Sequence, residues 1–213
     1  MDNATLQFVE FKDRLDAHIR AHAMPQSAVS PVDVLRRWTF LSEQFPRFLG
    51  AILARIPSPS AQCLVAKNIT GECGNGVKEQ MHSLLLANLV RSALGPEQMR
   101  FPTGPFQQVI ERKLEEISRM SAGEAIGLLI GLEAPAYDIL ALLRRSLLEV
   151  GMSPQVIDDS PYMRIHQEVE KVHQDDSLAT AEMVRELGCP DSEIVRGGDS
   201  AVEFWSAWWA AAY

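Results

Sequence analysis

The sequence predicts an all-α fold, a bundle of seven to nine helices in one domain over residues 1–213. Almost every apolar pattern repeats at three and four positions, as on one face of a helix, and none alternates convincingly with period two. Short turns rich in proline and glycine separate these patterns, and no internal repeat or low-complexity linker divides the chain.

Three helices are expected in the N-terminal half. The first covers residues 5–22. The second begins after Ser30-Pro31, where serine can cap the helix and proline fits its first turn, and Pro46 is expected to kink it. The third begins near residue 60 and runs to about residue 94, interrupted by the glycine-rich stretch 71–76.

Five helices are expected in the C-terminal half, where a charged amphipathic helix precedes a very apolar one. Their ranges are 106–118, 121–150, 161–174 with Ser160 as N-cap, 177–187 and 200–213. The last segment carries three tryptophans on a background of small residues. We expect these rings to pack across the bundle or at a homodimer interface.

Composition limits the classes of partner. Hydrophobic residues make up 46% and charged residues 23%, which is typical of a globular protein. The net charge of -8 comes with no cluster of Lys or Arg, so nucleic acid and anionic membrane are poor partners.

The cysteines and the N-terminus indicate the compartment. Cys63, Cys73 and Cys189 are odd in number and far apart, which argues against a disulfide framework and against a zinc knuckle. The N-terminus lacks the basic and apolar regions of a signal peptide, and no uninterrupted apolar stretch of about 18 residues is present. A soluble, cytoplasmic protein is expected.

One segment places three metal-binding side chain types on one helical face. At about 100° per residue, Glu170 lies about 40° and His173 about 20° from His166 around the helix axis. An apolar stripe beside this face puts the three groups at the margin of the core. The alternative is a solvated polar face with two incidental histidines.

Two further segments carry isolated polar groups beside apolar residues. Glu133 is the one ionisable residue in a stretch of thirteen, and burial without a partner would cost its carboxylate several kcal/mol. It therefore needs a cation, unless the helix turns it outward at Pro135. His82 lies one turn from core leucines, and Glu79 or Glu72 can reach the same side, although a lone histidine there can also be a satisfied core residue.

These groups can converge only inside a bundle, and together they favour a metal site. Imidazole and carboxylate without thiolate suit iron or manganese better than structural zinc. Three neutral imidazoles and three carboxylates carry a charge of -3, which matches two divalent ions with room for a further ligand.

The chain resembles the haem-oxygenase-like diiron oxidases and oxygenases from about Ser30 to His173. The resemblance is carried by residues 45–55, Asn68–Gly74, His82, the Glu133 helix, and Tyr162-x3-His166-x3-Glu170-x2-His173. It implies two Fe(II) ions, with O2 as co-substrate, on six ligands. These are Glu72, His82, Glu133, His166, Glu170 and His173.

Two departures from the family pattern concern these ligands. Glu170 stands where the family usually has aspartate, and this longer arm can shift the second iron. The stretch between Glu72 and His82 is glycine-rich and irregular, as in members that hold one iron loosely until substrate binds.

The resemblance also implies a reaction class. Members use an external electron donor and O2 to oxidise small amino or fatty acids, and this chain is similar to azetidine-forming oxidases of peptidyl-nucleoside antibiotic pathways. A free aliphatic amino acid such as isoleucine or valine is the expected substrate, for desaturation or C–N bond formation. Arg164, beside the ligand helix, is the candidate partner of its carboxylate.

Other functions remain open from the sequence. One alternative is cleavage or N-oxygenation of another small amino or fatty acid. A ferritin-like site would instead use Glu43, Glu79 with His82, Glu133, and Glu170 with His173, but has no place for His166. A metal-free enzyme on the same fold, or a metal-storing module, is the other class.

Overall fold

A computed structural model describes residues 17–25 and 29–211, with the side chains of residues 169–171 outside the description. The described residues form nine α-helices of defined bounds, a helical stretch over residues 17–23 and two short 3-10 turns, and they contain no strand, which confirms the all-α prediction. The helices are α2 (Pro31–Leu53), α3 (Pro59–Glu72), α4 (His82–Leu94), α5 (Gly104–Ile117), α6 (Ala122–Glu133), α7 (Ala136–Glu149), α8 (Pro154–Asp158), α9 (Pro161–Glu186) and α10 (Asp191–Ala210).

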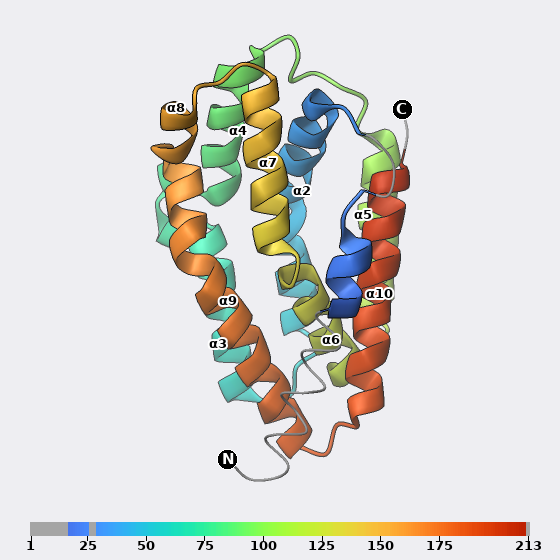
Figure 1. The fold of residues 1–213 in the computed structure, drawn as a ribbon. Helices are drawn as coiled ribbons and strands as arrows, with labels where there is room; N and C mark the ends of the chain where they lie inside the picture. The colour runs from blue at the N-terminus through green and yellow to red at the C-terminus, as the bar shows by residue number, and fades with distance from the viewer. Residues whose placement is uncertain (1–16, 26–28, 212–213) are drawn as a thin grey trace.

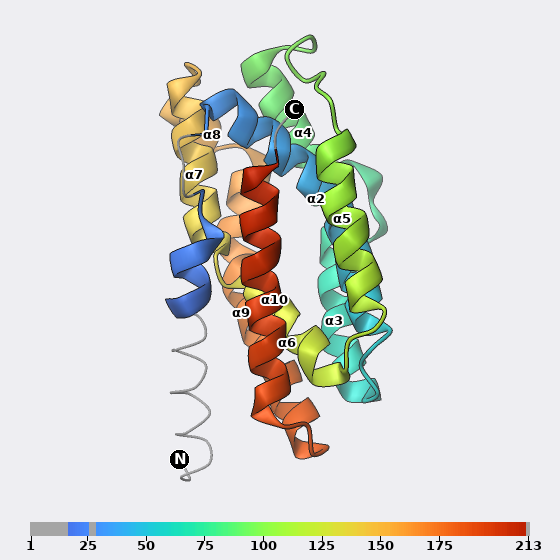
Figure 2. The same cartoon turned by 90° about the vertical axis from the view of Figure 1, so that its right-hand side faces the viewer.

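Helix α6 is the central element of the bundle. It packs against α10 on one side and α9 on the other, with α7 following it along the long axis of the molecule (Figures 1 and 2). Every residue from Ala125 to Glu133 is buried, so the helix has no solvated face. Residues 122–149 are apolar enough to cross a membrane by composition, but 78% of the apolar 18-residue window within them is buried inside the bundle, as expected of a core helix.

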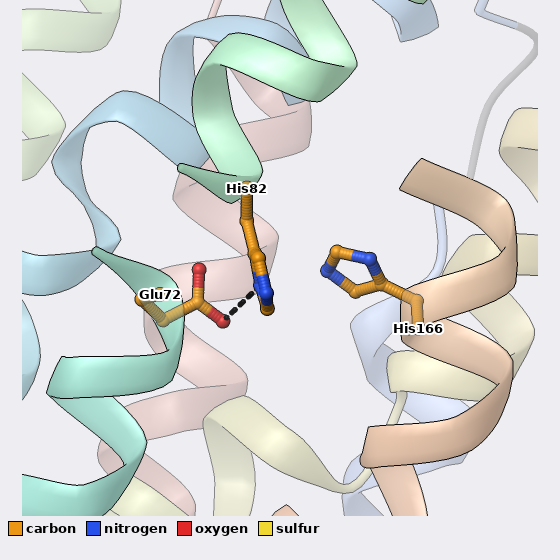
Figure 3. A group of neighbouring side chains, drawn as sticks. All are labelled: Glu72, His82 and His166. Atoms are coloured by element: carbon orange, nitrogen blue, oxygen red, sulfur yellow. Dashed lines mark ion pairs between the residues drawn. The ribbon is translucent and has the colours of Figure 1, made fainter. Parts of the chain in front are cut away.

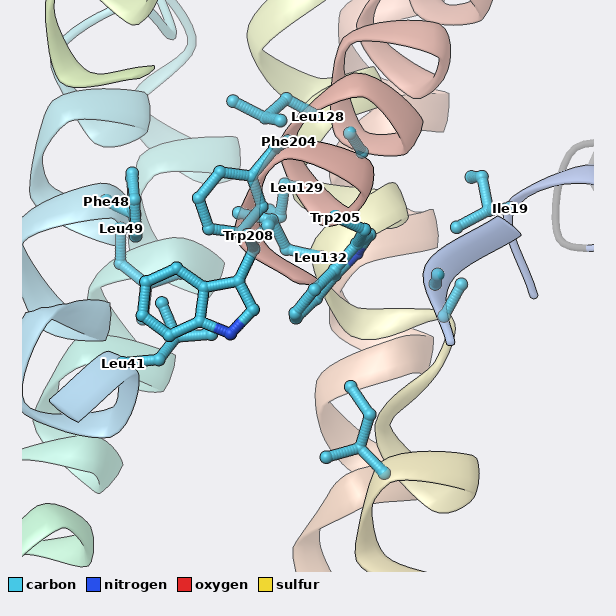
Figure 4. Close-up of a cluster of buried hydrophobic side chains, with 14 of the residues drawn as sticks. Ile19, Leu41, Phe48, Leu49, Leu128, Leu129, Leu132, Phe204, Trp205 and Trp208 are labelled. Atoms are coloured by element: carbon cyan, nitrogen blue, oxygen red, sulfur yellow. The ribbon is translucent and has the colours of Figure 1, made fainter. Parts of the chain in front are cut away.

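The aromatic end of α10 fills the core between α2 and α6 (Figure 4). Trp205 and Trp208 are completely buried, and the Trp205 indole N–H donates to the Gly131 carbonyl at 3.0 Å. Trp209 donates to the Ala23 carbonyl at 2.7 Å. The tryptophans therefore pack across the bundle, the first of the two arrangements that the sequence allowed.

Helices α6 and α10 touch through their backbones at glycines. A Cβ on Gly127 would lie 1.9 Å from the Ile194 carbonyl oxygen, and a Cβ on Gly197 would lie 2.0 Å from that of Glu124. No side chain fits at either position, so these glycines set the closest approach of the two helices.

Capping residues start several helices as predicted. The side chains of Ser30 and Ser160 accept hydrogen bonds from the first turns of α2 and α9. Ser121 and Glu124 form a complete capping box at α6. Helix α2 continues through Pro46 to Leu53.

Several predicted boundaries are wrong. The helix expected over 121–150 is two helices, because the chain turns at Ala134-Pro135. The helices expected over 161–174 and 177–187 are one, α9, and the last helix begins at Asp191 rather than at residue 200. Of the helix expected over 5–22, residues 17–23 are helical and residues 5–16 lie outside the described part.

Candidate metal centre

Three helix segments bring Glu72, His82 and His166 together. Glu72 is the last residue of α3, His82 is the first of α4, and His166 lies in the second turn of α9. One ligand atom from each lies within 4.8 Å of the others, and the three side chains point toward one another (Figure 3). They are 7%, 4% and 7% exposed, so this polar cluster is enclosed in the core.

A left-handed turn between α3 and α4 makes Glu72 and His82 neighbours. Gly74, Asn75 and Gly76 have φ angles of +68°, +53° and +83°. A Cβ on Gly74 would lie 2.5 Å from the backbone of Gln80 and Met81, so only glycine fits where the loop closes on itself. This closure places the end of α3 next to the start of α4.

The two histidines of the cluster are arranged as metal ligands require. His166 Nδ1–H donates to the Tyr162 carbonyl at 2.9 Å, which leaves the lone pair on Nε2. His82 Nδ1 lies 3.2 Å from Glu72 Oε1 but is a buried atom with no hydrogen bond of proper geometry. An imidazole nitrogen and a carboxylate oxygen that are close without bonding each other fit a shared cation between them.

A cavity lies beside this cluster. Glu72 and His166 line it, and so do Glu133 and His173. Glu133, at the end of α6, is 4% exposed and accepts a hydrogen bond from Asn68 Nδ2 at 2.9 Å. His173 of α9 is also buried, and its Nε2 lies 4.0 Å from where a Cβ on Gly71 would be, so the imidazole lies against α3. The rest of the cavity lining is mainly apolar. It consists of Trp38, Leu41, Ser42, Phe45, Leu132, Ala136, Leu140 and Tyr162.

The protonation states inside the cavity follow from burial and charge. Burial raises the pKa of Glu133 to about 8, more than the Asn68 hydrogen bond can offset, and the charge of Glu72 adds to the rise. Burial also opposes ionisation of Glu72, but His82 and the other imidazoles outweigh it and lower the pKa of Glu72. Burial lowers the pKa of His166 to about 4, so this ring is neutral and can bind a metal.

Four of the six expected ligands, Glu72, Glu133, His166 and His173, thus line one cavity, and His82 lies beside it in contact with Glu72. The side chain of the sixth, Glu170, lies outside the described residues. Glu79 and Glu43, the possible extra ligands, are exposed and do not line the cavity, so the ferritin-like ligand set is not brought together. Arg164 is also exposed and away from the cavity lining.

Sequence reasoning did not assign Asn68 its role as the partner of Glu133. The signal was present, because Asn68 and Glu72 are four residues apart and therefore share one face of α3. The amide oxygen of Asn68 is buried without a hydrogen bond, which places a second unsatisfied polar atom beside the cluster.

A family model described as an iron-containing redox enzyme matches residues 32–197. The chain belongs to this family. Membership in the iron-containing redox enzymes agrees with the donor set of the cavity, since imidazole and carboxylate ligands without thiolate suit iron. No curated protein matches the sequence.

Solved structures show the same fold. A CADD-like protein of unknown function from Nostoc punctiforme has a TM-score of 0.75 and 15% identity over 96% of both chains. A second crystal structure of a CADD-like protein of this organism gives a TM-score of 0.68 and 15% identity, over 96% of this chain and 93% of that one. Together with the family model, these likenesses place the chain in the haem-oxygenase-like superfamily.

Proposed function

We propose that the protein is a non-haem diiron oxidase that uses O2 to functionalise aliphatic C–H bonds of a small amino acid. One observation carries the proposal. Four buried side chains of ligand type, from α3, α6 and α9, line a cavity whose other walls are mainly apolar, and a fifth, His82 of α4, contacts Glu72 beside it. Glu72, His82, Glu133, His166, Glu170 and His173 would hold two Fe(II) ions.

Charge supports two ions rather than one. Glu72 is held as a carboxylate by the imidazoles around it, whereas Glu133 has no cationic partner among the described residues and is protonated at neutral pH. A single divalent ion bound by Glu72, His82 and His166 would leave Glu133 protonated. A second ion beside Glu133 and His173 would supply the charge that a buried carboxylate requires.

The protein's own residues hold the ligands and keep water out. The Tyr162 carbonyl fixes the ring of His166, and the Asn68 amide orients Glu133. Leu41, Leu132 and Leu140 surround the site with hydrocarbon. When bound, iron supplies the redox chemistry by which O2 can oxidise an unactivated C–H bond.

The proposed substrate is a free aliphatic amino acid of isoleucine or valine type, and the products are a desaturated amino acid or an azetidine. The mainly apolar walls suit an aliphatic side chain. Either reaction removes two electrons and two protons from the substrate, whereas reduction of O2 to two waters takes four of each. An external electron donor must therefore supply the other two electrons.

Anaerobic titration with Fe(II) tests the metal centre. The wild-type protein is expected to bind two Fe(II) per chain, and His166→Ala and Glu133→Gln are expected to lose at least one. Iron content after desalting measures the occupancy. Glu79→Gln is the matched control, because this exposed carboxylate lies near His82 in sequence but outside the cavity. Full occupancy in His166→Ala would reject the ligand assignment.

Oxygen consumption tests the reaction. With reduced iron and a chemical electron donor, isoleucine or valine should accelerate O2 uptake, and the product should be lighter than the substrate by two hydrogens. Uptake that no amino acid changes would reject the substrate class and would favour a metal-storing protein.

A further inference from the structure

We propose that α2 carries an ammonium-binding subsite in the cavity, formed by the backbone carbonyl and the hydroxyl of Ser42. It would receive the amino group of the substrate. The inference rests on the proposed function for the identity of that substrate, but the binding groups belong to α2 and are separate from the metal ligands.

Proline inside α2 leaves the Ser42 carbonyl without its helical partner. In an α-helix the carbonyl of residue 42 accepts from the N–H of residue 46, and here residue 46 is proline, which has none. Ser42 and Phe45 both line the cavity, so this carbonyl lies in the turn of α2 that borders it. Proline within a helix lowers the stability of that helix. In α2 it also leaves the Ser42 carbonyl oxygen available as a hydrogen-bond acceptor beside the cavity.

The Ser42 hydroxyl is a second unused polar group at the same place. Ser42 is 8% exposed, and its hydroxyl forms no hydrogen bond with any described residue. Thr39, one turn earlier on α2, instead donates to the Leu35 carbonyl at 2.8 Å in the usual way for a helical hydroxyl. The Ser42 oxygen therefore remains available to a ligand.

The electrostatics of the cavity favour a cation at this position. No Lys or Arg occurs among the described residues that line it, so no positive side chain on the wall opposes the binding of a cation. The aromatic side chains of Trp38 and Tyr162 line it as well and are joined by a hydrogen bond of 3.1 Å between the indole N–H and the phenol oxygen. Two oxygen acceptors and aromatic rings together are typical of a site for an alkylammonium group.

The subsite also sets the orientation of an amino acid. Its ammonium group would bind at α2, and its carboxylate would be left to face the metal ligands, since no cationic side chain is described on the cavity wall. The aliphatic side chain would then lie against the leucines of α6 and α7.

Calorimetric titration with n-butylammonium tests the subsite, with 1-butanol and butyrate as probes of equal length. The wild-type protein is expected to bind butylammonium at least tenfold more tightly than 1-butanol. Pro46→Ala restores an N–H for the Ser42 carbonyl, and Ser42→Ala removes the hydroxyl. Each is expected to weaken binding of butylammonium by about tenfold, as for loss of one hydrogen bond to a charged group, and to leave 1-butanol unaffected.

Gly50→Ala is the matched control for a change in helix stability. A Cβ at Gly50 meets nothing within 4 Å, so this variant strengthens α2 without touching the cavity and should bind like wild type. Thermal unfolding checks that Pro46→Ala is folded. Unchanged affinity for butylammonium in Pro46→Ala, or equal binding of butylammonium and 1-butanol by the wild type, overturns the subsite.

Iron stoichiometry measured on the same samples separates the two proposals. If the protein binds no iron but Pro46→Ala still weakens butylammonium binding, the proposed function fails and the subsite stands. If two irons bind and the variants behave like wild type, the subsite fails and the proposed function stands.

Discussion

Glu72 and Glu133 show how residues of one type acquire different chemistry on one cavity wall. The imidazole of His82, 3.2 Å away, stabilises the charge of Glu72, whereas an uncharged amide faces Glu133. In the metal-free protein at neutral pH the first is a carboxylate and the second a neutral acid. A cation that binds beside Glu133 must therefore displace its proton, which makes metal binding depend on pH.

The metal-free protein is expected to lose stability as the pH rises from 6.5 to 8. The folded protein keeps the Glu133 proton up to a pKa of about 8, while the unfolded chain releases it near 4.5. In this interval each pH unit lowers the free energy of unfolding by about 1.4 kcal/mol. His166, with a pKa of about 4 when folded and 6.5 when unfolded, acts in the opposite sense only below pH 6.5. Urea unfolding at several pH values measures the slope.

Glu133→Gln serves as the control for this slope. An amide of similar size keeps a neutral group beside Asn68 but has no proton to release, so its stability should be nearly flat between pH 6.5 and 8. An equal slope in the variant and in the wild type would show that another group causes the loss.

At the scale of elements, α6 and α10 depend on glycine in two ways. Gly127 and Gly197 lie where the backbones touch, so the pair of helices needs positions with no side chain. The same glycines lower the intrinsic helix propensity of both segments. Tertiary packing therefore overrides local preference along this contact.

Gly127→Ala is expected to destabilise the protein by about 3 kcal/mol, because the added methyl group meets the Ile194 carbonyl at 1.9 Å and the helices must separate. Gly50→Ala, at an open position of α2, should instead raise stability by about 0.5 to 1 kcal/mol. Denaturant unfolding of both variants measures these two changes in stability. A neutral effect at Gly127 would contradict the close contact.

Helix boundaries set by local signals could be predicted from the sequence, whereas those that depend on long-range contacts could not. Periodicity and caps located the starts of α2, α5, α6 and α9, since those signals are local. The start of α10 was missed because Gly197-Gly198 looks like a helix break when its packing partner is unknown. The boundary predicted near Gln174 is also wrong, because α9 continues through this residue to Glu186.

Spacing predicted the cluster on α9 and the isolated carboxylate on α6, because helix geometry fixes which side chains share a face. It could not decide between Glu72 and Glu79, which are both near His82 in sequence. The left-handed turn at Gly74 decides this by turning Glu72 inward and leaving Glu79 exposed. The hydrogen bond from Asn68 to Glu133 likewise could not be predicted, because it joins α3 to α6 and depends on how these two helices pack.

At the scale of the whole molecule, the cavity lies among helices from both halves of the chain. Its ligand-type residues come from α3, α6 and α9, and His82 of α4 contacts Glu72 beside it, so a bound metal would join most of the bundle. Anything that binds the folded chain and not the unfolded chain shifts the unfolding equilibrium. Metal content and global stability are therefore coupled.

Loading with Fe(II) under anaerobic conditions is expected to raise the unfolding temperature. Free metal at about 100 times its dissociation constant adds about 2.7 kcal/mol. For a chain of this size, this corresponds to a rise of about 5 to 10 °C. Differential scanning calorimetry measures the shift, and a chelator should reverse it. His82→Ala should show a smaller rise, and an equal rise in that variant would place the stabilising metal elsewhere.

The turn that begins at Gly74 has a consequence for how this loop can vary. Lys78, Glu79 and Gln80 face solvent, so exchanges there change only the outer surface of the loop. Any larger residue at position 74 would force the loop open and pull the ends of α3 and α4 apart. A position that coordinates nothing thus controls the spacing of a carboxylate and an imidazole, and designed variants of this protein should diversify the loop tip while keeping its first residue.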